Sequence, residues 1–138
     1  MFSFSNKKQS FRDIYALSDR IAESKKILCK YPKHIPVIVD CGDNVPKLKK
    51  YKYLVPDDVP ASQIIVSIRK NMDVDSSTAI FIFYDDVMIC PSMLMRPLYE
   101  QYLTKKSEKI KSHLFSEDEM MDKFFYIYVT FENTFGKY

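Results

Sequence analysis

The residues best suited to chemistry stand at the end of the chain, where Phe135 precedes Gly136. The preceding residues 124–131 are aromatic or β-branched almost throughout, which favours a strand, and a run that is apolar on both faces suits a central one. Gly136 is one of only two glycines in the sequence. We interpret the chain as a scaffold that holds this strand and presents residues 132–138 as a flexible tail for other enzymes. A loose chain end without chemistry is the alternative.

The other residues able to carry catalysis or bind metal are widely scattered. They are three cysteines and two histidines: Cys29, Cys41, Cys90, His34 and His113. No C-x-x-C pair is present, so neither a zinc site nor a disulfide framework is expected. No nucleophile pattern connects these residues either. We therefore expect reduced cysteines, no metal, no cofactor and no enzymatic activity.

The composition predicts a single folded domain over residues 1–138. Hydrophobic residues make up 46% of the sequence, with ten Tyr and ten Phe, which is enough for a core. A net charge of +3 is too small to indicate a nucleic-acid partner. The N-terminus lacks the apolar core of a signal peptide, and no apolar run approaches the roughly 18 residues of a membrane helix. We expect a cytoplasmic protein that reaches a membrane only by attachment.

The first half of the sequence predicts a helix followed by a hairpin. Apolar residues recur at helical spacing over residues 11–29, so residues 1–31 form an N-terminal helical extension. Residues 35–41 and 51–55 have strand composition, and the turn at Gly42 pairs them most simply as a hairpin. Pro36 cannot donate a backbone hydrogen bond, so it belongs at the strand start or on an unpaired side.

The second half predicts helix, strand, helix and strand. A helix begins in the loop at residues 56–60 and shows an apolar face through Ile64 and Ile68. Residues 79–84 form a strand. Ser92 can cap a further helix to residue 102, which Pro97 is expected to kink or shorten. The charged residues 103–123 are predicted to form an insertion, either a helical excursion or a loop, and we expect it to be mobile.

This order of elements predicts an α+β fold. Two strands, a crossing helix and two more strands give a four-stranded mixed sheet with the first and last strands side by side at its centre. That is the ubiquitin-like, or β-grasp, arrangement, here with an N-terminal helical extension. On periodicity alone it competes with other α+β sandwiches.

Several short motifs, taken in one order, resemble the autophagy ubiquitin-like modifier family, which includes GABARAP and the light-chain-three proteins. The resemblance covers nearly the whole chain, and it is strong as a set although each motif is weak. The motifs are Ala16-x-Ser-x-Arg-Ile-Ala22, Ile35-Pro-Val-Ile-Val39, Lys52-Tyr-Leu-Val-Pro56, Gln63, Ser67-Ile-Arg-Lys70, Ala79-Ile-Phe-Ile-Phe83, Leu98-Tyr99 and Glu132-Asn-Thr-Phe-Gly136.

The resemblance implies a modifier that is attached to lipid. A processing cysteine protease would cut after Gly136, with Phe135 as its aromatic handle. Ubiquitin-like activating and conjugating enzymes would then join the exposed carboxylate to phosphatidylethanolamine, placing the protein on autophagosomal or related membranes. Glycine suits these steps because its missing Cβ allows close approach. Two acyl chains would hold the protein firmly on a bilayer.

The resemblance also implies a groove in which an aromatic-x-x-aliphatic peptide of a cargo receptor adds as a strand beside the second strand. An aromatic pocket would be formed by Ile21, Pro36, Ile38, Lys52, Leu54 and, from the last strand, Phe124 or Tyr126. An aliphatic pocket would be formed by Tyr53, Val55, Pro56, Val59 and Ile64. Contacts to acids that flank the peptide would come from Lys50 and Lys52. Read without the resemblance, these residues are an ordinary core and a protected sheet edge.

Three positions depart from the family pattern. Leu17 stands where an acid usually lines the aromatic pocket, His34 replaces an arginine, and Ser67 makes the aliphatic pocket shallower. The insertion at residues 103–123 is expected to lie away from the groove. An alternative function is an unconjugated peptide-binding adaptor of the same fold on a trafficking pathway, in which the tail is unused.

Overall fold

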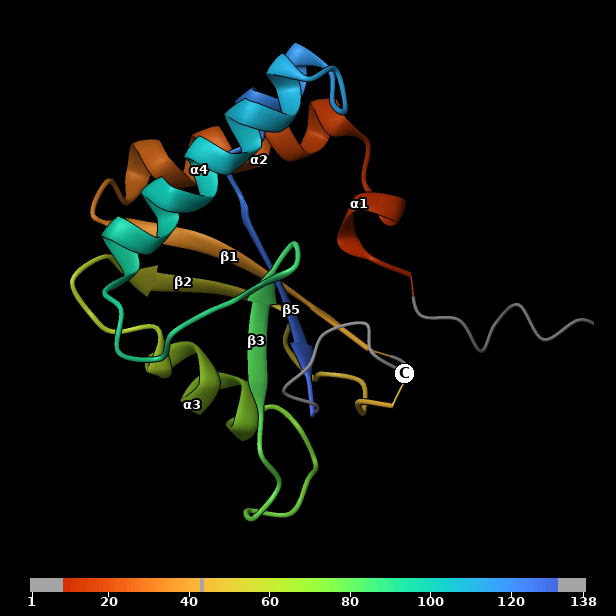
Figure 1. The fold of residues 1–138 in the computed structure, drawn as a ribbon, viewed down its shortest axis with the longest axis vertical. Helices are drawn as coiled ribbons and strands as arrows, with labels where there is room; N and C mark the ends of the chain where they lie inside the picture. Colours follow the sequence, from red (N-terminus) through yellow and green to blue (C-terminus); the bar gives the residue numbers. More distant parts are fainter. Residues whose placement is uncertain (1–8, 43, 132–138) are drawn as a thin grey trace, which may run out of the picture.

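The computed structural model describes residues 9–42 and 44–131 and arranges them as one mixed sheet with helices around it (Figure 1). The strands are β1 (His34–Cys41), β2 (Lys52–Pro56), β3 (Phe81–Tyr84), β4 (Val87–Met88) and β5 (Phe125–Thr130). The helices are α1 (Phe11–Ile14), α2 (Leu17–Lys30), α3 (Ser62–Lys70), α4 (Met95–Lys111) and the 3-10 helix η2 (Glu117–Met121).

The sheet has the order β2-β1-β5-β3-β4, with β1 and β5 parallel at its centre and the other pairs antiparallel. This confirms the α+β ubiquitin-like fold and the central position of the first and last strands. The sheet has five strands rather than the four expected, because β3 turns through Asp85 and Asp86 and pairs with the short β4. Asp85 has a φ of 52°, a conformation that two-residue hairpin loops require.

The predicted N-terminal helix is interrupted. Ser10 and Asp13 form a reciprocal capping box around α1, and the chain becomes extended at Tyr15 before α2 begins. The extended backbone at Tyr15 and Ala16 separates two helices that the apolar spacing alone would merge. Arg20 and Ser24 are the buried residues of α2, and Ile27 of the same helix is partly buried against the core, so both polar and apolar side chains of α2 contact the rest of the protein.

Helix α4 differs from its prediction at both ends. It begins at Met95 with Leu94 as its N-cap, so Ser92 is not the cap. Pro97 is the third residue of the helix and produces no break, because N–H groups in a first turn have no intrahelical partner to lose. The helix continues to Lys111 instead of ending near residue 102.

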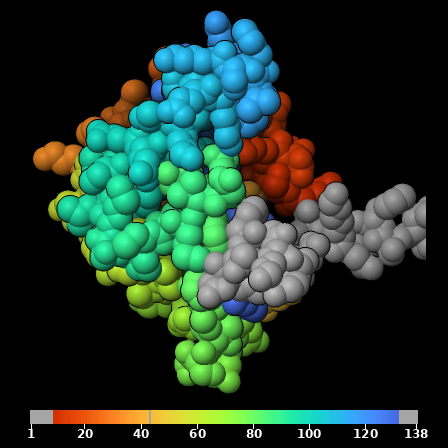
Figure 2. All heavy atoms as spheres, viewed as in Figure 1, coloured from red at the N-terminus to blue at the C-terminus, as the bar shows by residue number. Residues whose placement is uncertain are grey.

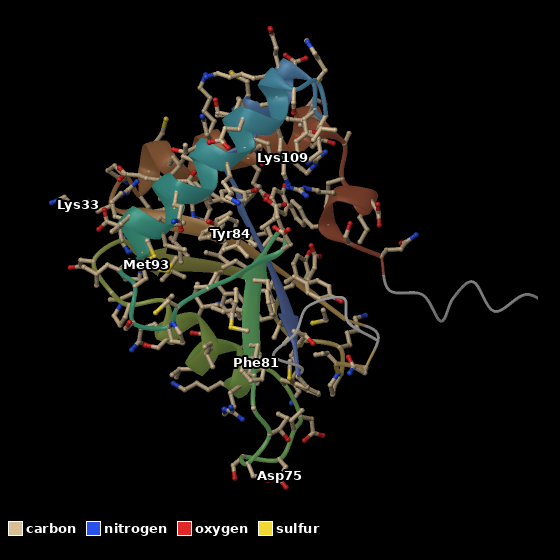
Figure 3. The ribbon with its side chains drawn as sticks, viewed as in Figure 1. Lys33, Asp75, Phe81, Tyr84, Met93 and Lys109 are labelled. Carbon is tan, nitrogen blue, oxygen red and sulfur yellow. The ribbon has the colours of Figure 1, made fainter. Side chains whose placement is uncertain are left out.

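Residues 103–123 therefore follow the helical alternative, through the second half of α4 and η2. Lys106 is 3% exposed and Asp122 is fully buried. Lys109 forms a salt bridge with Asp85 (2.8 Å), which ties this part of α4 to the turn that follows Tyr84 (Figure 3). Lys106 and Asp122 of this segment, which we expected to be mobile, are part of the buried interior of the fold.

Candidate functional site: a groove at the edge of the sheet

The residues predicted for the aromatic pocket come together on the face of the sheet that α2 covers. The strand register pairs Lys52 with Ile38 and Ile38 with Tyr126, forming one row across β2, β1 and β5. Pro36 pairs with Leu54, and Phe124 immediately precedes β5 beside them. Because alternate residues of a strand share a face, these two rows point the same way. Ile38 and Phe124 are fully buried, whereas Leu54 at the rim is 40% exposed.

Glu23, rather than Ile21, is the α2 residue on the side of β2. Its carboxylate forms a salt bridge of 2.8 Å with the Lys52 ammonium. Ile21 lies two residues earlier, about 200° around the helix, and so points to the opposite flank. Glu23 is thus the α2 residue with a recorded contact to β2, and a place for Ile21 in the aromatic pocket stays a prediction. The acid expected to be missing at Leu17 is supplied by Glu23.

The predicted aliphatic pocket lies on the other face of β2. Tyr53 and Val55 alternate with Lys52 and Leu54 along the strand, and the Tyr53 hydroxyl contacts Asn71 at the end of α3. Burial raises the pKa of Tyr53 to about 12. Ile64 of α3 is 1% exposed. Around these buried residues, Val59 is partly buried and Pro56 is exposed.

The outer edge of β2 has no strand beside it in the described part of the chain. The Val39 N–H donates to the Tyr51 carbonyl (2.8 Å). Because hydrogen-bonded and non-hydrogen-bonded residue pairs alternate along an antiparallel ladder, this bond shows which β2 residues bond to β1. The backbone N–H and C=O groups of Lys52 and Leu54 consequently point away from β1. This edge therefore directs backbone donors and acceptors away from the sheet, between the residues of the two predicted pockets.

A buried polar cluster lies at the base of the aromatic pocket. The Asp122 carboxylate accepts hydrogen bonds from Arg20 (2.7 Å) and from the Tyr126 hydroxyl (2.6 Å). The Lys106 ammonium donates to the Asp122 carbonyl (2.8 Å). Burial raises the pKa of Tyr126, assisted by Asp122, and burial lowers the pKa of Lys106 to about 8. The cluster fixes Tyr126 and connects residues 103–123 to the groove.

The chain matches the family described as "Autophagy protein Atg8 ubiquitin like" over residues 19–107. The chain belongs to the Atg8 family. It is 35% identical over 132 residues to Autophagy-related protein 8 of Mycosarcoma maydis, covering 94% of this chain and 98% of that one. It is 32% identical over 130 residues to Autophagy-related protein 8i of Arabidopsis thaliana, covering 93% and 99%. The protein is thus a ubiquitin-like modifier of the autophagy type, as its motifs predicted.

Solved Atg8 structures have the same fold. A Trypanosoma brucei ATG8 superimposes with a TM-score of 0.69 at 21% identity, covering 90% of this chain and 95% of that one. A Plasmodium falciparum Atg8, solved in complex with an Atg3 peptide of the same organism, gives a TM-score of 0.67 at 24% identity, covering 91% and 98%. The identities are low enough that these likenesses show the fold alone.

The remaining predicted features lie around or beyond this groove. Lys50 is exposed, with its ammonium 5.1 Å from the centre of the Tyr53 ring. His34 begins β1, and Ser67 lies in α3. Phe135 and Gly136 of the tail lie outside the described residues. Within the described ranges, no helix is long and apolar enough to cross a membrane. The same ranges hold no cluster of three or more His, Cys, Asp or Glu placed to bind a metal ion.

Sequence reasoning missed three residues of the site, Glu23, Phe11 and Asp122. Glu23 lacked a signal because its role depends on contact with Lys52, 29 positions away. Phe11 was expected at a helix start, but its packing beside Phe124 had no signal, because the two residues are far apart in the sequence. Asp122 lies two residues before the apolar run that begins at Phe124. From the sequence alone, an acid at that position indicates only where the strand begins.

Proposed function

We propose that this Atg8-family protein is processed after Gly136 and conjugated to phosphatidylethanolamine, and that its β2 groove recruits aromatic-x-x-aliphatic peptides. In the first step, water hydrolyses the peptide bond between Gly136 and Lys137 in the cleft of a cysteine protease. The Gly136 carboxylate then attacks ATP to give an acyl adenylate with release of pyrophosphate. An enzyme thiol displaces AMP to form a thioester, and thiol exchange passes the acyl group to a second enzyme. The lipid amine attacks the thioester carbonyl, the thiol leaves, and an amide remains.

The groove proposal is carried by one observation: the two candidate pockets lie on opposite faces of an edge strand. On one face of β2, Lys52 forms a salt bridge with Glu23 of α2, and on the other face Tyr53 contacts Asn71 at the end of α3. In an extended peptide, residues three apart point to opposite faces. A peptide paired with the outer edge of β2 would thus direct its aromatic residue to one pocket and its aliphatic residue to the other. The backbone supplies affinity and the pockets supply specificity.

The partners follow from these two activities. A processing protease and the activating and conjugating enzymes act on the tail, and the Plasmodium falciparum complex makes a conjugating-enzyme peptide a candidate for the groove. Cargo-receptor peptides with flanking acids would meet Lys50 and Lys52, since charge attraction favours their encounter. The lipid anchor would place the cytoplasmic protein peripherally on autophagosomal membranes.

Conjugation is tested by intact mass spectrometry of the protein from its native cells, with wild type beside Gly136→Ala. We expect a form that lacks Lys137 and Tyr138, part of it carrying a phospholipid mass, and we expect the variant to lose that mass. An unprocessed chain in both samples would reject conjugation and leave a peptide-binding adaptor. A membrane-bound pool that persists in the variant would show attachment by other means.

The groove is tested with two matched variants, Leu54→Ser and Val66→Ser. Both leucine and valine are exposed, at 40% and 44%, but Val66 points away from Ile64 on α3, about 200° around the helix. Removing apolar contact at Leu54 should weaken binding of a Trp-x-x-Leu peptide by about tenfold or more, since buried aliphatic side chains contribute about 1.5–3 kcal/mol. Equal affinities of the two variants would reject this groove.

A further inference from the structure

The short helix α1 lies against the candidate aromatic pocket. Phe11 is 5% exposed, and its ring centre is 5.3 Å from that of Phe124 and 6.4 Å from that of Tyr126. The Lys52 ammonium is 5.7 Å from the centre of the same ring. Three residues predicted to line the pocket for a partner peptide's aromatic residue therefore lie close to Phe11, an aromatic residue of the protein itself.

Two tyrosines complete an aromatic enclosure around Phe11. The ring of Tyr15 is 4.7 Å away and the ring of Tyr51 is 6.0 Å away. Tyr15 follows α1, whereas Tyr51 immediately precedes β2, and their side chains share a hydrogen bond. Aromatic pairs at these separations attract one another beyond simple area burial. The enclosure thus joins α1 to the beginning of the edge strand.

Several contacts among the described residues hold α1 in place. Phe11 is its only buried residue. The Arg12 guanidinium stacks 3.7 Å over the Tyr126 ring, and the backbone N–H of Phe11 bonds to the partly buried Asp40 carboxylate. A four-residue helix is not stable by itself, so these contacts determine where α1 lies. Displacing it would expose one buried side chain of α1 and leave the sheet and α2 paired as before.

The sequence of α1 resembles the peptides that the groove is proposed to bind. Phe11-Arg12-Asp13-Ile14 places an aliphatic residue three positions after an aromatic one. Because α1 is helical, its two apolar residues cannot reach opposite faces of β2 as an extended peptide would. Ile14 is in fact 56% exposed. Of the two apolar residues of α1, only Phe11 therefore contacts the candidate groove, at the aromatic pocket.

We propose that α1 is an internal occupant of the aromatic pocket, and that a partner peptide binds only after its own aromatic residue displaces Phe11. The inference rests on the proposed peptide groove and adds a regulatory element to it. Two aromatic rings cannot occupy the same contact surface of Phe124. Any factor that binds the N-terminal segment would thereby open the groove.

The size of the effect is worked out from the Phe11 ring, the buried side chain of α1. When the binding-competent state is a minor fraction of the protein, the apparent dissociation constant is raised by the inverse of that fraction. Burial of one phenylalanine ring corresponds to a competent fraction of about one tenth to one hundredth. Removing the ring should tighten peptide binding by about ten- to one-hundredfold.

The test measures binding of an acidic Trp-x-x-Leu peptide to the full chain. The chain contains no tryptophan, so the fluorescence of the peptide reports binding directly. Phe11→Ala should bind about tenfold more tightly or better than wild type. Arg12→Gln, which weakens the stacking on Tyr126 but leaves the pocket intact, should shift affinity in the same direction by less. Phe115→Ala removes an exposed ring at the far end of α4 and should bind as wild type does.

A second measurement follows the segment itself by NMR. Proton contacts between the Phe11 and Phe124 rings should be present in the free protein and lost when the peptide is bound. Equal or weaker binding by folded Phe11→Ala, or ring contacts that persist in the complex, would overturn the inference and make Phe11 a wall of the pocket. Failure of the peptide to bind folded wild type and every variant would reject the groove itself.

Discussion

The buried pair Arg20–Asp122 offers the sharpest test of how residues 103–123 stabilise the protein. Asp122 is fully buried and the Arg20 side chain is 8% exposed. The carboxylate accepts hydrogen bonds from Arg20, Tyr126 and the Phe124 N–H. Removing one partner of a buried ion pair costs about 3–5 kcal/mol, because the other charge is left without compensation. Asp122→Ala should therefore destabilise the protein by about that amount, a large share of the 5–15 kcal/mol typical of a domain.

The variant Asp122→Asn keeps nearly the same side-chain shape but removes the negative charge, so it measures the contribution of that charge to stability. Asparagine can still accept one hydrogen bond, but it leaves the Arg20 guanidinium and the nearby Lys106 ammonium without their carboxylate. If charge dominates, the asparagine variant should lose at least about 2 kcal/mol, whereas a neutral hydrogen bond contributes only about 1 kcal/mol. A matched control is Asp118→Asn in η2, where the carboxylate is exposed and the change should stay within about 0.5 kcal/mol.

Urea unfolding followed by circular dichroism measures these losses, with thermal melting as a second probe. The urea midpoint should fall while the slope stays constant, because the exposed area on unfolding is unchanged. At about 3 °C for each kcal/mol in a domain of this size, the alanine variant should melt about 9–15 °C lower. Losses below about 1 kcal/mol in both Asp122 variants would show that the pair is solvated and that residues 103–123 contribute little.

Two further predictions concern charges near the groove. Burial lowers the pKa of Lys106 from 10.5 to about 8. Between pH 8 and pH 10 the unfolded chain keeps a proton that the folded chain releases, so wild-type stability should rise with pH, by up to about 3 kcal/mol at about 1.4 kcal/mol for each pKa unit. Lys106→Met should lose this rise in urea melts at pH 7.5 and 9.5; an unchanged slope would assign the effect to another group. The salt bridge Glu23–Lys52 is partly exposed, so Glu23→Gln should change stability by less than about 1 kcal/mol. It should also release Lys52 and tighten an acidic peptide by up to about fivefold at low salt; weaker binding would mean that Glu23 organises the pocket.

The central strands could be predicted because the apolar or polar character of successive residues indicates which faces of a strand are buried. Residues 35–39 and 124–129 are apolar or aromatic on both faces, which suits the interior of a sheet covered on both sides. The structure places β1 and β5 there, parallel and central. The short β4 could not be predicted, since two residues carry no periodicity. Its existence depends on the left-handed backbone at Asp85.

The length of α4 could not be predicted because it depends on distant contacts. Residues 103–111 are mostly polar, so their spacing gives no apolar stripe. What keeps them helical and in place is tertiary: Lys106 reaches the Asp122 carbonyl and Lys109 reaches Asp85. Figure 2 shows the end of α4 and η2, in blue, forming the top of this view of the protein, with α1 in red below. A charged segment can thus be well anchored by a few polar side chains that composition would assign to solvent.

The faces of the β2 residues could be predicted from the sequence, whereas the α2 residue that contacts β2 could not, for one physical reason. Alternate residues of a strand point to opposite faces of the sheet. Lys52 and Leu54 must therefore share one face of β2, and Tyr53 and Val55 must share the other. On a helix a shift of two residues turns a side chain by about 200°, and only the contact with Lys52 shows that Glu23 faces the groove. The same sensitivity applies to α1, where no periodicity could assign Phe11 to the pocket. Tyr126 is held by Asp122 from the C-terminal side and by Arg12 from the N-terminal side. The aromatic end of the groove is therefore shaped by two segments that are distant from β2 in sequence, and partner selection in this protein should depend on them as much as on the edge strand.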